Sequence, residues 1–205
     1  MFKSDLITGV THLIENDSRL AAVIEKAGPC KLKPHKNYYL SFVEAIVGQQ
    51  LSMKAADKIF GRFMDYFDND PQPEKIIAAP DQTMRNFGLS WAKVAYVKDI
   101  AAKILSDEVH FRGLAARTDE DIIPEFIKIK GVGVWTVQMF LIFTLGRLNV
   151  LPVGDLGIKK GIMKVYNLKK LPDEKKIIAL ARKNKWSPYN SIASWYIWRS
   201  LDMEL

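Results

Sequence analysis

An aspartate that follows a glycine and opens a basic segment is the first residue in this sequence that suggests chemistry. Asp155 comes directly after Gly154 and is followed by Lys159 and Lys160. A carboxylate at a helix start is stabilised by the helix dipole, and it can stabilise a developing cation or orient a water molecule. Aspartate is also a favoured helix cap, so the spacing alone leaves both interpretations open.

Two glycines lie about twenty residues before this aspartate, between two apolar segments. Gly131 and Gly133 have no side chains to hold a partner away, so backbone N–H groups at the start of the next helix can face a ligand. Such groups suit a phosphate. A lone GxG more often marks an ordinary turn between helices, and here Trp135 and Asp155 strengthen the phosphate interpretation.

The segments around these residues have the periodicity of helices. Apolar residues recur at three- and four-residue spacing, and no segment alternates with the period of two that a strand requires. We expect helices at residues 5–15, 19–26, 38–49, 53–67, 74–79, 81–87, 92–106, 119–128, 135–144, 173–184 and 187–202, with a further short helix opened by Asp155. The sequence therefore predicts an all-α fold.

The composition indicates a folded protein that favours a polyanionic partner. The chain has 205 residues, of which 48% are apolar, and its 30 Lys and Arg against 23 Asp and Glu give a net charge of +7. That charge is moderate, so a basic surface without a partner remains an alternative. A single cysteine, Cys30, excludes an internal disulfide and a four-cysteine metal or iron–sulfur site.

Nothing in the sequence indicates export or membrane insertion. Residues 1–5 do not begin an apolar signal region, and no apolar run approaches the length of a membrane span. We therefore expect a soluble intracellular protein without a membrane partner, placed in the cytoplasm or nucleoid, or in the nucleus if the source is eukaryotic.

Three segments in this order resemble the helix-hairpin-helix DNA glycosylases, and within them the 3-methyladenine DNA glycosylase II branch. The segments are residues 42–52 (FVEAIVGQQLS), 124–160 and 186–191 (WSPYNS). The resemblance implies a single two-lobed helical domain with no iron–sulfur cluster and no N-terminal α/β domain. It implies a central lobe of about residues 37–150, including a hairpin at 126–144, and a second lobe made from residues 1–36 and 155–205.

The resemblance also implies an activity. It is that of a monofunctional DNA glycosylase in base excision repair, acting as a monomer on double-stranded DNA that contains damaged bases. Such an enzyme hydrolyses the N-glycosidic bond of alkylated bases, here 3-methyladenine and related purines. Asp155 matches the catalytic aspartate, which stabilises the sugar as it becomes cationic. Bifunctional relatives carry a lysine at the position of Trp135, so no lyase activity is implied.

The same resemblance implies a base pocket. Trp135 and Tyr189 match aromatic pocket residues, and an indole face can stack on a cationic alkylated purine. Leu156 and Met139 match positions where the bacterial prototype has tyrosines, so the pocket is expected to be less aromatic. A core position is the competing interpretation of Trp135. The other tryptophans of the C-terminal part are assigned to the core: Trp186, Trp195 and Trp198.

DNA contacts are implied in two places. Gln50, Leu51 and Ser52 match a loop that enters the minor groove, where Leu51 is the expected wedge for a flipped nucleotide and Gln50 the alternative. A leucine buried at a helix junction is the competing interpretation. The expected phosphate contacts are at Lys130, Gly131, Gly133 and Val134, with Lys159 nearby. The backbone carbonyls of Ile127, Ile129 and Val132 match those that hold Na⁺ or K⁺, and no other cofactor is expected.

Other functions remain open. A glycosylase for another lesion, such as uracil or a deaminated purine, would use the same Asp155. A non-catalytic helix-hairpin-helix DNA-binding protein would not need that carboxylate. A helical scaffold with an incidental basic surface would have no DNA affinity that falls steeply with salt.

Overall fold

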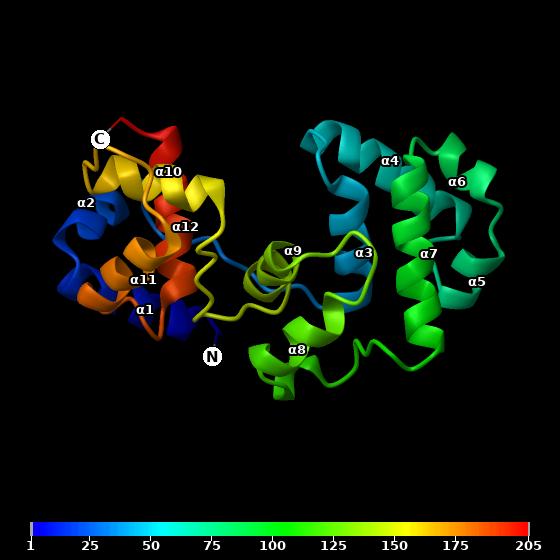
Figure 1. Ribbon diagram of the computed structural model, residues 1–205, viewed down its shortest axis with the longest axis horizontal. Coiled ribbons are helices and arrows are strands. Elements are labelled where there is room, and N and C mark those ends of the chain that lie inside the picture. Colours follow the sequence, from blue (N-terminus) through cyan, green and yellow to red (C-terminus); the bar gives the residue numbers. More distant parts are fainter. Residues whose placement is uncertain (1, 205) are drawn as a thin grey trace. The chain divides into compact units, whose positions relative to one another are not determined.

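The computed structural model describes residues 2–204, and within them every regular element is helical (Figure 1). The predicted all-α fold is confirmed. The α-helices are α1 Phe2–Asn16, α2 Ser18–Ala27, α3 Tyr38–Gly48, α4 Met53–Tyr66, α5 Pro73–Ala78, α6 Asp81–Asn86, α7 Trp91–Leu105, α8 Asp119–Phe126, α9 Val134–Met139, α10 Leu156–Val165, α11 Glu174–Lys183 and α12 Asn190–Arg199. Short 3₁₀ turns follow at Leu114–Ala116 (η1) and Ser200–Asp202 (η3), and a π-helical stretch at Phe140–Thr144 (η2).

The chain forms two compact units. Unit 1 comprises Met1–Pro34 and Leu141–Leu205, and unit 2 comprises His35–Phe140. Unit 1 therefore holds α1, α2 and α10–α12, whereas unit 2 holds α3–α9. Residues 141–150, which the sequence assigned to the central lobe, cluster with the N- and C-terminal helices in unit 1.

Unit 2 is built around α7 and an aromatic core. Helix α7 packs against α3 on one side and against α5 and α6 on the other (Figure 1). The Phe42 ring of α3 lies 5.2 Å from Phe126 and 5.0 Å from Phe140, measured between ring centroids. Phe126 and Phe140 lie on either side of the glycine hairpin, so their packing on α3 fixes both ends of that hairpin in the unit.

Unit 1 is organised around α12, which packs against α1, α2 and α10. Gly161 of α10 faces the backbone of Ile197, and a Cβ at Gly161 would lie 2.5 Å from the Ile197 carbonyl oxygen. Only a glycine permits this approach. Elsewhere in the unit, the buried Asp17 carboxylate accepts hydrogen bonds from the Leu20 amide and the Trp186 indole at 3.0 and 2.8 Å, and from the Tyr166 hydroxyl.

Most helices differ from their expected ranges by a residue or more at an end, and three of them show why. The helix expected at 135–144 becomes α-helical α9 and then the wider π-helical η2. The helix expected to end at residue 128 ends at Phe126, because the Lys128 and Ile129 amides bond three residues back instead of four. The last long helix begins at Asn190 instead of Ser187, since Pro188 and a non-helical Tyr189 precede it. Such boundaries depend on local turn geometry, which hydrophobic periodicity does not record.

None of the helices within residues 2–204 combines the length and the apolar character needed to cross a bilayer.

Candidate functional site

The Asp155 carboxylate is the N-cap of α10 and is held in a fixed orientation. Its Oδ1 accepts a hydrogen bond from the Ile158 amide at 2.7 Å and a second from the Trp198 indole N–H at 2.8 Å. The residue is half-buried, so the carboxylate is neither sealed in the core nor fully surrounded by water. A carboxylate at a helix start with two donors on one oxygen is held in one orientation.

Glycines on α10 allow the aspartate and Trp198 to meet. A Cβ at Gly157 would lie 2.9 Å both from the Asp155 Oδ1 and from the Trp198 indole. Together with Gly161, one turn further along α10, Gly157 keeps the α10–α12 crossing close. The second glycine in the sequence GDLG therefore makes room for the aspartate–tryptophan pair.

Trp198 is one residue that sequence reasoning missed. It was assigned to the core, but it is half-buried and donates to the candidate catalytic carboxylate, whereas Trp186 is fully buried as expected. The ring of Phe143 lies 5.7 Å from the Trp198 ring and supports it. No local signal distinguishes Trp198 from Trp195, because its partner lies 43 residues earlier.

The two hairpin glycines are needed for different reasons. Gly131 has a φ of +76°, and a Cβ there would lie 2.2 Å from the ring of Tyr96, so the fold itself requires this glycine. Gly133 has a φ of −105°, which any residue can adopt, and a Cβ there would meet nothing within 4 Å. The protein does not need a glycine at 133, which is consistent with a ligand approaching that backbone closely.

Lys130 and Val134 flank these glycines at the surface of unit 2. The Lys130 amide donates to Asp99 Oδ2 at 2.8 Å, so this amide is already satisfied within the protein. The Lys130 ammonium is exposed, 3.7 Å from the same carboxylate. Val134 is 49% exposed and begins α9, whose N-cap Gly133 has no side chain with which to cap the helix.

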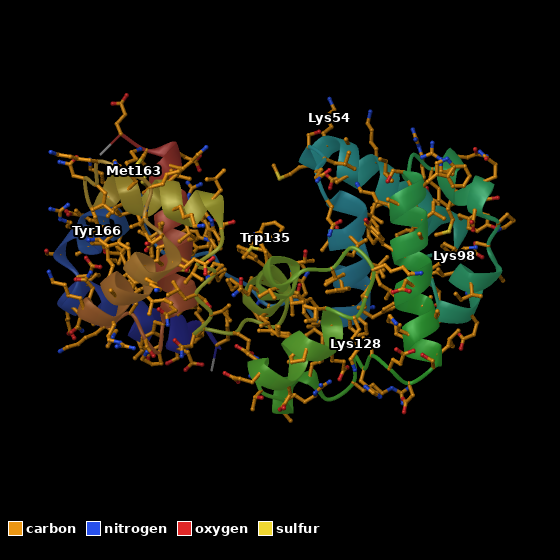
Figure 2. All side chains as sticks on the ribbon, viewed as in Figure 1. Lys54, Lys98, Lys128, Trp135, Met163 and Tyr166 are labelled. Carbon is orange, nitrogen blue, oxygen red and sulfur yellow. The ribbon has the colours of Figure 1, made fainter. Side chains whose placement is uncertain are left out.

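The four expected base-pocket residues are divided between the units. Trp135, labelled in Figure 2, lies at the start of α9 and is 49% exposed. Met139 ends the same helix in unit 2. In unit 1, Leu156 is exposed, and the Tyr189 ring packs against α1, 5.2 Å from the His12 ring. An exposed Trp135 disagrees with the competing core interpretation, and the pocket itself stays a prediction.

The loop expected to carry the wedge is ordered by groups outside it. Gln50 is exposed and has a φ of +57°, Leu51 is 38% exposed, and Ser52 caps α4 by accepting from the Ala55 amide. The ammonium of Lys93 on α7 donates to the carbonyls of Val47 and Gln49 at 2.8 and 2.7 Å. Burial lowers the pKa of Lys93.

A further contact joins this loop to the hairpin. The Gln49 side-chain amide donates to the Gly131 carbonyl at 3.4 Å. Together with Lys93, this contact holds the backbone before the loop tip, so that exposed Gln50 and Leu51 extend from an anchored base. The competing interpretation, in which Leu51 is buried at a helix junction, disagrees with this exposure. Sequence reasoning did not identify Lys93.

The candidate cation ligands are three backbone carbonyls near the hairpin. Ile129 and Val132 are buried, and the Ile129 carbonyl accepts the Val132 amide at 3.1 Å, whereas the side chain of Ile127 is exposed. Within residues 2–204 no group of three His, Cys, Asp or Glu side chains is arranged to hold a metal ion. A Na⁺ or K⁺ ion at these carbonyls stays a prediction.

Comparison with known protein families identifies the chain. Residues 43–188 match the description of the HhH-GPD superfamily of base excision DNA repair proteins. This protein belongs to the HhH-GPD superfamily. The matched range contains the hairpin and Asp155 of the HhH-GPD chain and ends before Trp198.

Individual relatives of this HhH-GPD protein cover nearly its whole length. DNA-3-methyladenine glycosylase 1 of Schizosaccharomyces pombe is 33% identical over 97% of this chain and 90% of its own. A crystal structure of a DNA-3-methyladenine glycosidase from Bacillus halodurans superposes with a TM-score of 0.81 at 35% identity, covering 93% of this chain and 88% of that one. The Schizosaccharomyces pombe 3-methyladenine DNA glycosylase in complex with abasic DNA gives a TM-score of 0.83 at 29% identity, over 96% and 97% of the two chains.

Proposed function

We propose that this protein is a monofunctional DNA glycosylase that hydrolyses the N-glycosidic bond of alkylated bases, chiefly 3-methyladenine and related purines, in base excision repair. Its relatives at about one-third identity carry the names of 3-methyladenine glycosylases and cover almost the whole chain. The substrate class of this protein follows from that kinship together with the geometry around Asp155.

The observation that carries the proposal is the fixed carboxylate of Asp155. Cleavage of an N-glycosidic bond builds positive charge on the deoxyribose as the base leaves. A carboxylate locked by the Ile158 amide and the Trp198 indole needs no reorganisation to stabilise that charge, and it can orient the attacking water. Alkylated purines are already cationic, so their departure needs little acid catalysis.

The absence of a lyase step is proposed from the residue at position 135. A glycosylase that also cleaves the strand attacks the sugar with an amine and forms a Schiff base. This chain has Trp135 two residues after Gly133, and an indole cannot act as such a nucleophile. The exposed indole face can instead stack on a cationic base.

Double-stranded DNA with damaged bases is the proposed partner. The related Schizosaccharomyces pombe enzyme was solved with abasic DNA. Here the open backbone at Gly133 suits a DNA phosphate, and the exposed Gln50–Leu51 tip suits insertion at a flipped nucleotide. We further propose that the protein acts as a monomer inside the cell. The hairpin carbonyls are also proposed to bind Na⁺ or K⁺ next to the phosphate.

The test is the identity of the released bases. The protein is incubated with methylated duplex DNA, the free bases are identified by mass, and the strand is analysed before and after addition of an amine. We expect release of 3-methyladenine and abasic strands that stay intact until amine is added. Release of uracil or hypoxanthine from matched duplexes, with methylated DNA untouched, would assign another lesion. Strand cleavage without amine would contradict the monofunctional mechanism.

A further inference from the structure

The net positive charge of this protein lies in one of its two units. Unit 1 carries 17 Lys and Arg against 9 Asp and Glu, a net charge of +8. Unit 2 carries 13 Lys and Arg against 14 Asp and Glu, a net charge of −1, although it contains the glycine hairpin and the Gln50–Leu51 loop. The electrostatic attraction for a polyanion therefore comes from unit 1 and not from the hairpin unit.

Within unit 1 the charge is concentrated on and beside α11. Seven exposed cations make up what we call the α11 basic surface: Lys169, Lys170, Lys175, Lys176, Arg182, Lys183 and Lys185. None of their side chains has a carboxylate partner among residues 2–204. Unit 2 is different, because many of its cations are paired with acids: Lys75–Asp70, Lys98–Asp81, Lys103–Glu108, Arg117–Glu125 and Lys130–Asp99.

The cations on α11 share one side of the helix. At 3.6 residues per turn, Lys175, Lys176, Arg182 and Lys183 fall within about a third of the helix circumference, opposite the buried Ile177 and Ala181. The two pairs are separated by about 10 Å along the axis at 1.5 Å per residue, which is about three nucleotides of rise along one DNA strand.

A cavity borders this surface. It has a volume of about 460 Å³, and Lys176 and Lys183 line it together with Arg19 and Tyr166. Tyr166 is labelled in Figure 2. The Arg19 guanidinium lies 5.8 Å from the Tyr166 ring centroid and donates to the Val165 carbonyl at 3.4 Å, so it is fixed at the cavity wall. Asp17 also lines the cavity, but its carboxylate is bonded to Leu20, Tyr166 and Trp186, and the three cations outnumber it.

We infer that the α11 basic surface, with the cavity beside it, is a second DNA-binding surface that holds the sugar-phosphate backbone of a duplex without reading its sequence. It rests on the proposed function, because DNA is the polyanion that a glycosylase must find. A small anion would need only the cavity, whereas the row of cations along α11 extends beyond it and matches a chain of phosphates. Exposed Lys and Arg without aromatic or amide side chains aimed outward contact phosphates and give no base specificity.

This surface provides affinity for undamaged DNA around the lesion. Each phosphate neutralised by a cation releases a counterion, so binding weakens with salt by a slope of about 0.9 per contact on duplex DNA. A glycosylase whose hairpin unit is close to neutral would otherwise have little long-range attraction for the duplex that it searches.

The test compares two variants with the same loss of charge. The first changes Lys175, Lys176, Arg182 and Lys183 to Gln, which keeps helix propensity and breaks no ion pair. The matched control changes four other exposed lysines to Gln: Lys3, Lys31, Lys33 and Lys36. Affinity for a long undamaged duplex is measured over a salt series, and base excision is measured on a short methylated duplex at saturating protein.

We expect the α11 variant to bind the long duplex at least tenfold more weakly than the unchanged protein. The slope of log K against log salt concentration should become shallower by about two to four, and excision on the short duplex should not change. The control keeps most of both. An α11 variant with the salt slope of the unchanged protein would overturn the inference. So would an equal fall in the control, because net charge alone would then explain the result. Failure of the proposed function is a separate result: the unchanged protein would release no base from the short duplex.

Discussion

At the scale of single residues, the proposed chemistry of this protein rests on the Asp155 carboxylate, whose Oδ1 accepts hydrogen bonds from the Ile158 amide and the Trp198 indole. The Ile158 amide belongs to the helix that the aspartate caps, so any helix start supplies such a donor. The Trp198 indole comes from α12 and is specific to this fold. A simple N-cap would not need it. We therefore interpret Trp198 as a positioning residue that holds the carboxylate for its work on the sugar.

Replacing Trp198 by Phe tests this role. Phenylalanine keeps an aromatic ring beside Phe143 but cannot donate to Asp155. A hydrogen bond to a charged group contributes on the order of 1.5–3 kcal/mol, so we expect kcat to fall about tenfold to a hundredfold with little change in KM. The measurement is the steady-state rate of base release against substrate concentration.

The control for this variant is Trp195→Phe. Trp195 is half-buried on the same helix, with its ring 4.9 Å from Tyr196, and no hydrogen bond joins it to Asp155. We expect it to leave kcat unchanged. Equal losses in both variants would mean that packing of α12, and not the bond to the carboxylate, explains the effect.

At the scale of elements, the glycine hairpin separates the requirements of folding from those of binding. Gly131 combines a left-handed backbone with a ring of Tyr96 against its Cα, whereas Gly133 has an ordinary backbone and open space around it. Two residues of the same type, two positions apart, therefore have different reasons to be glycine.

Alanine substitutions should distinguish these reasons. Gly131→Ala is expected to destabilise unit 2 by at least about 1–2 kcal/mol, because it adds left-handed strain to a steric clash. Gly133→Ala should cost less than about 1 kcal/mol, because alanine is a poorer helix N-cap than glycine but meets no clash here. It should weaken DNA binding, because its methyl group would stand where the proposed phosphate approaches. Thermal melts and DNA titrations of both variants check this. A stable Gly133→Ala protein with unchanged DNA affinity would remove the phosphate role from this backbone.

Glu125 of α8 holds the segment that precedes this helix through hydrogen bonds to His110 and Arg117. Its carboxylate accepts from the Arg117 guanidinium at 2.6 and 3.2 Å and from the His110 amide at 2.7 Å. Burial of Glu125 opposes ionisation, but these donors outweigh it and lower the pKa of the carboxyl. A carboxyl whose pKa is lower in the folded state stabilises the protein above its unfolded pKa and loses that contribution as pH falls.

In the variant Glu125→Gln, the free energy of unfolding should therefore depend less on pH in the acid range. Near neutral pH we expect a loss on the order of 1–3 kcal/mol, because the amide cannot pair with Arg117 in the same way. At acid pH, where the carboxyl is protonated, the free energies of unfolding of the variant and the unchanged protein should become equal. Denaturant unfolding over a pH series measures both. A difference that stays constant down to the lowest pH would exclude the ionised pair as its cause.

At the scale of the whole molecule, the two units differ in what they contribute. Unit 1 contains the fixed carboxylate and the excess of positive charge, and unit 2 contains the hairpin and the exposed loop tip. The only cysteine of the sequence, Cys30, lies in unit 1, so its reactivity can report the unfolding of that unit. Burial raises the pKa of its thiol to about 11.

Thiol labelling should report the unfolding of unit 1. With a pKa of about 11, roughly one thiol in ten thousand is ionised at neutral pH, and the thiolate is the reactive form. We expect labelling of the native protein to be at least tenfold slower than that of the denatured chain, and to accelerate in denaturant as unit 1 unfolds. Equal rates in the native and denatured states would show that Cys30 is not protected.

Much of the fold could be predicted from the sequence, because helices and their caps are local. Period and cap residues predicted the all-α class, and Ser52, Thr118 and Asp155 accept the amide bonds expected of helix N-caps. The candidate site could be predicted less completely. The bonds from Trp198 to Asp155 and from Lys93 to the end of α3 join residues more than forty positions apart. Periodicity carries no record of such pairs, and the concentration of charge in one unit emerged only when the units were known.

The central claim is that the negative charge of Asp155 drives base release. Asparagine is an equally good helix cap and keeps an oxygen for Ile158 and Trp198, so Asp155→Asn removes the charge while preserving the local structure. The decisive measurement is single-turnover release of 3-methyladenine from methylated duplex DNA, with binding to the same DNA measured in parallel. We predict that release falls by about a hundredfold or more and that binding stays within a few fold. Release at the rate of the unchanged protein would contradict the account.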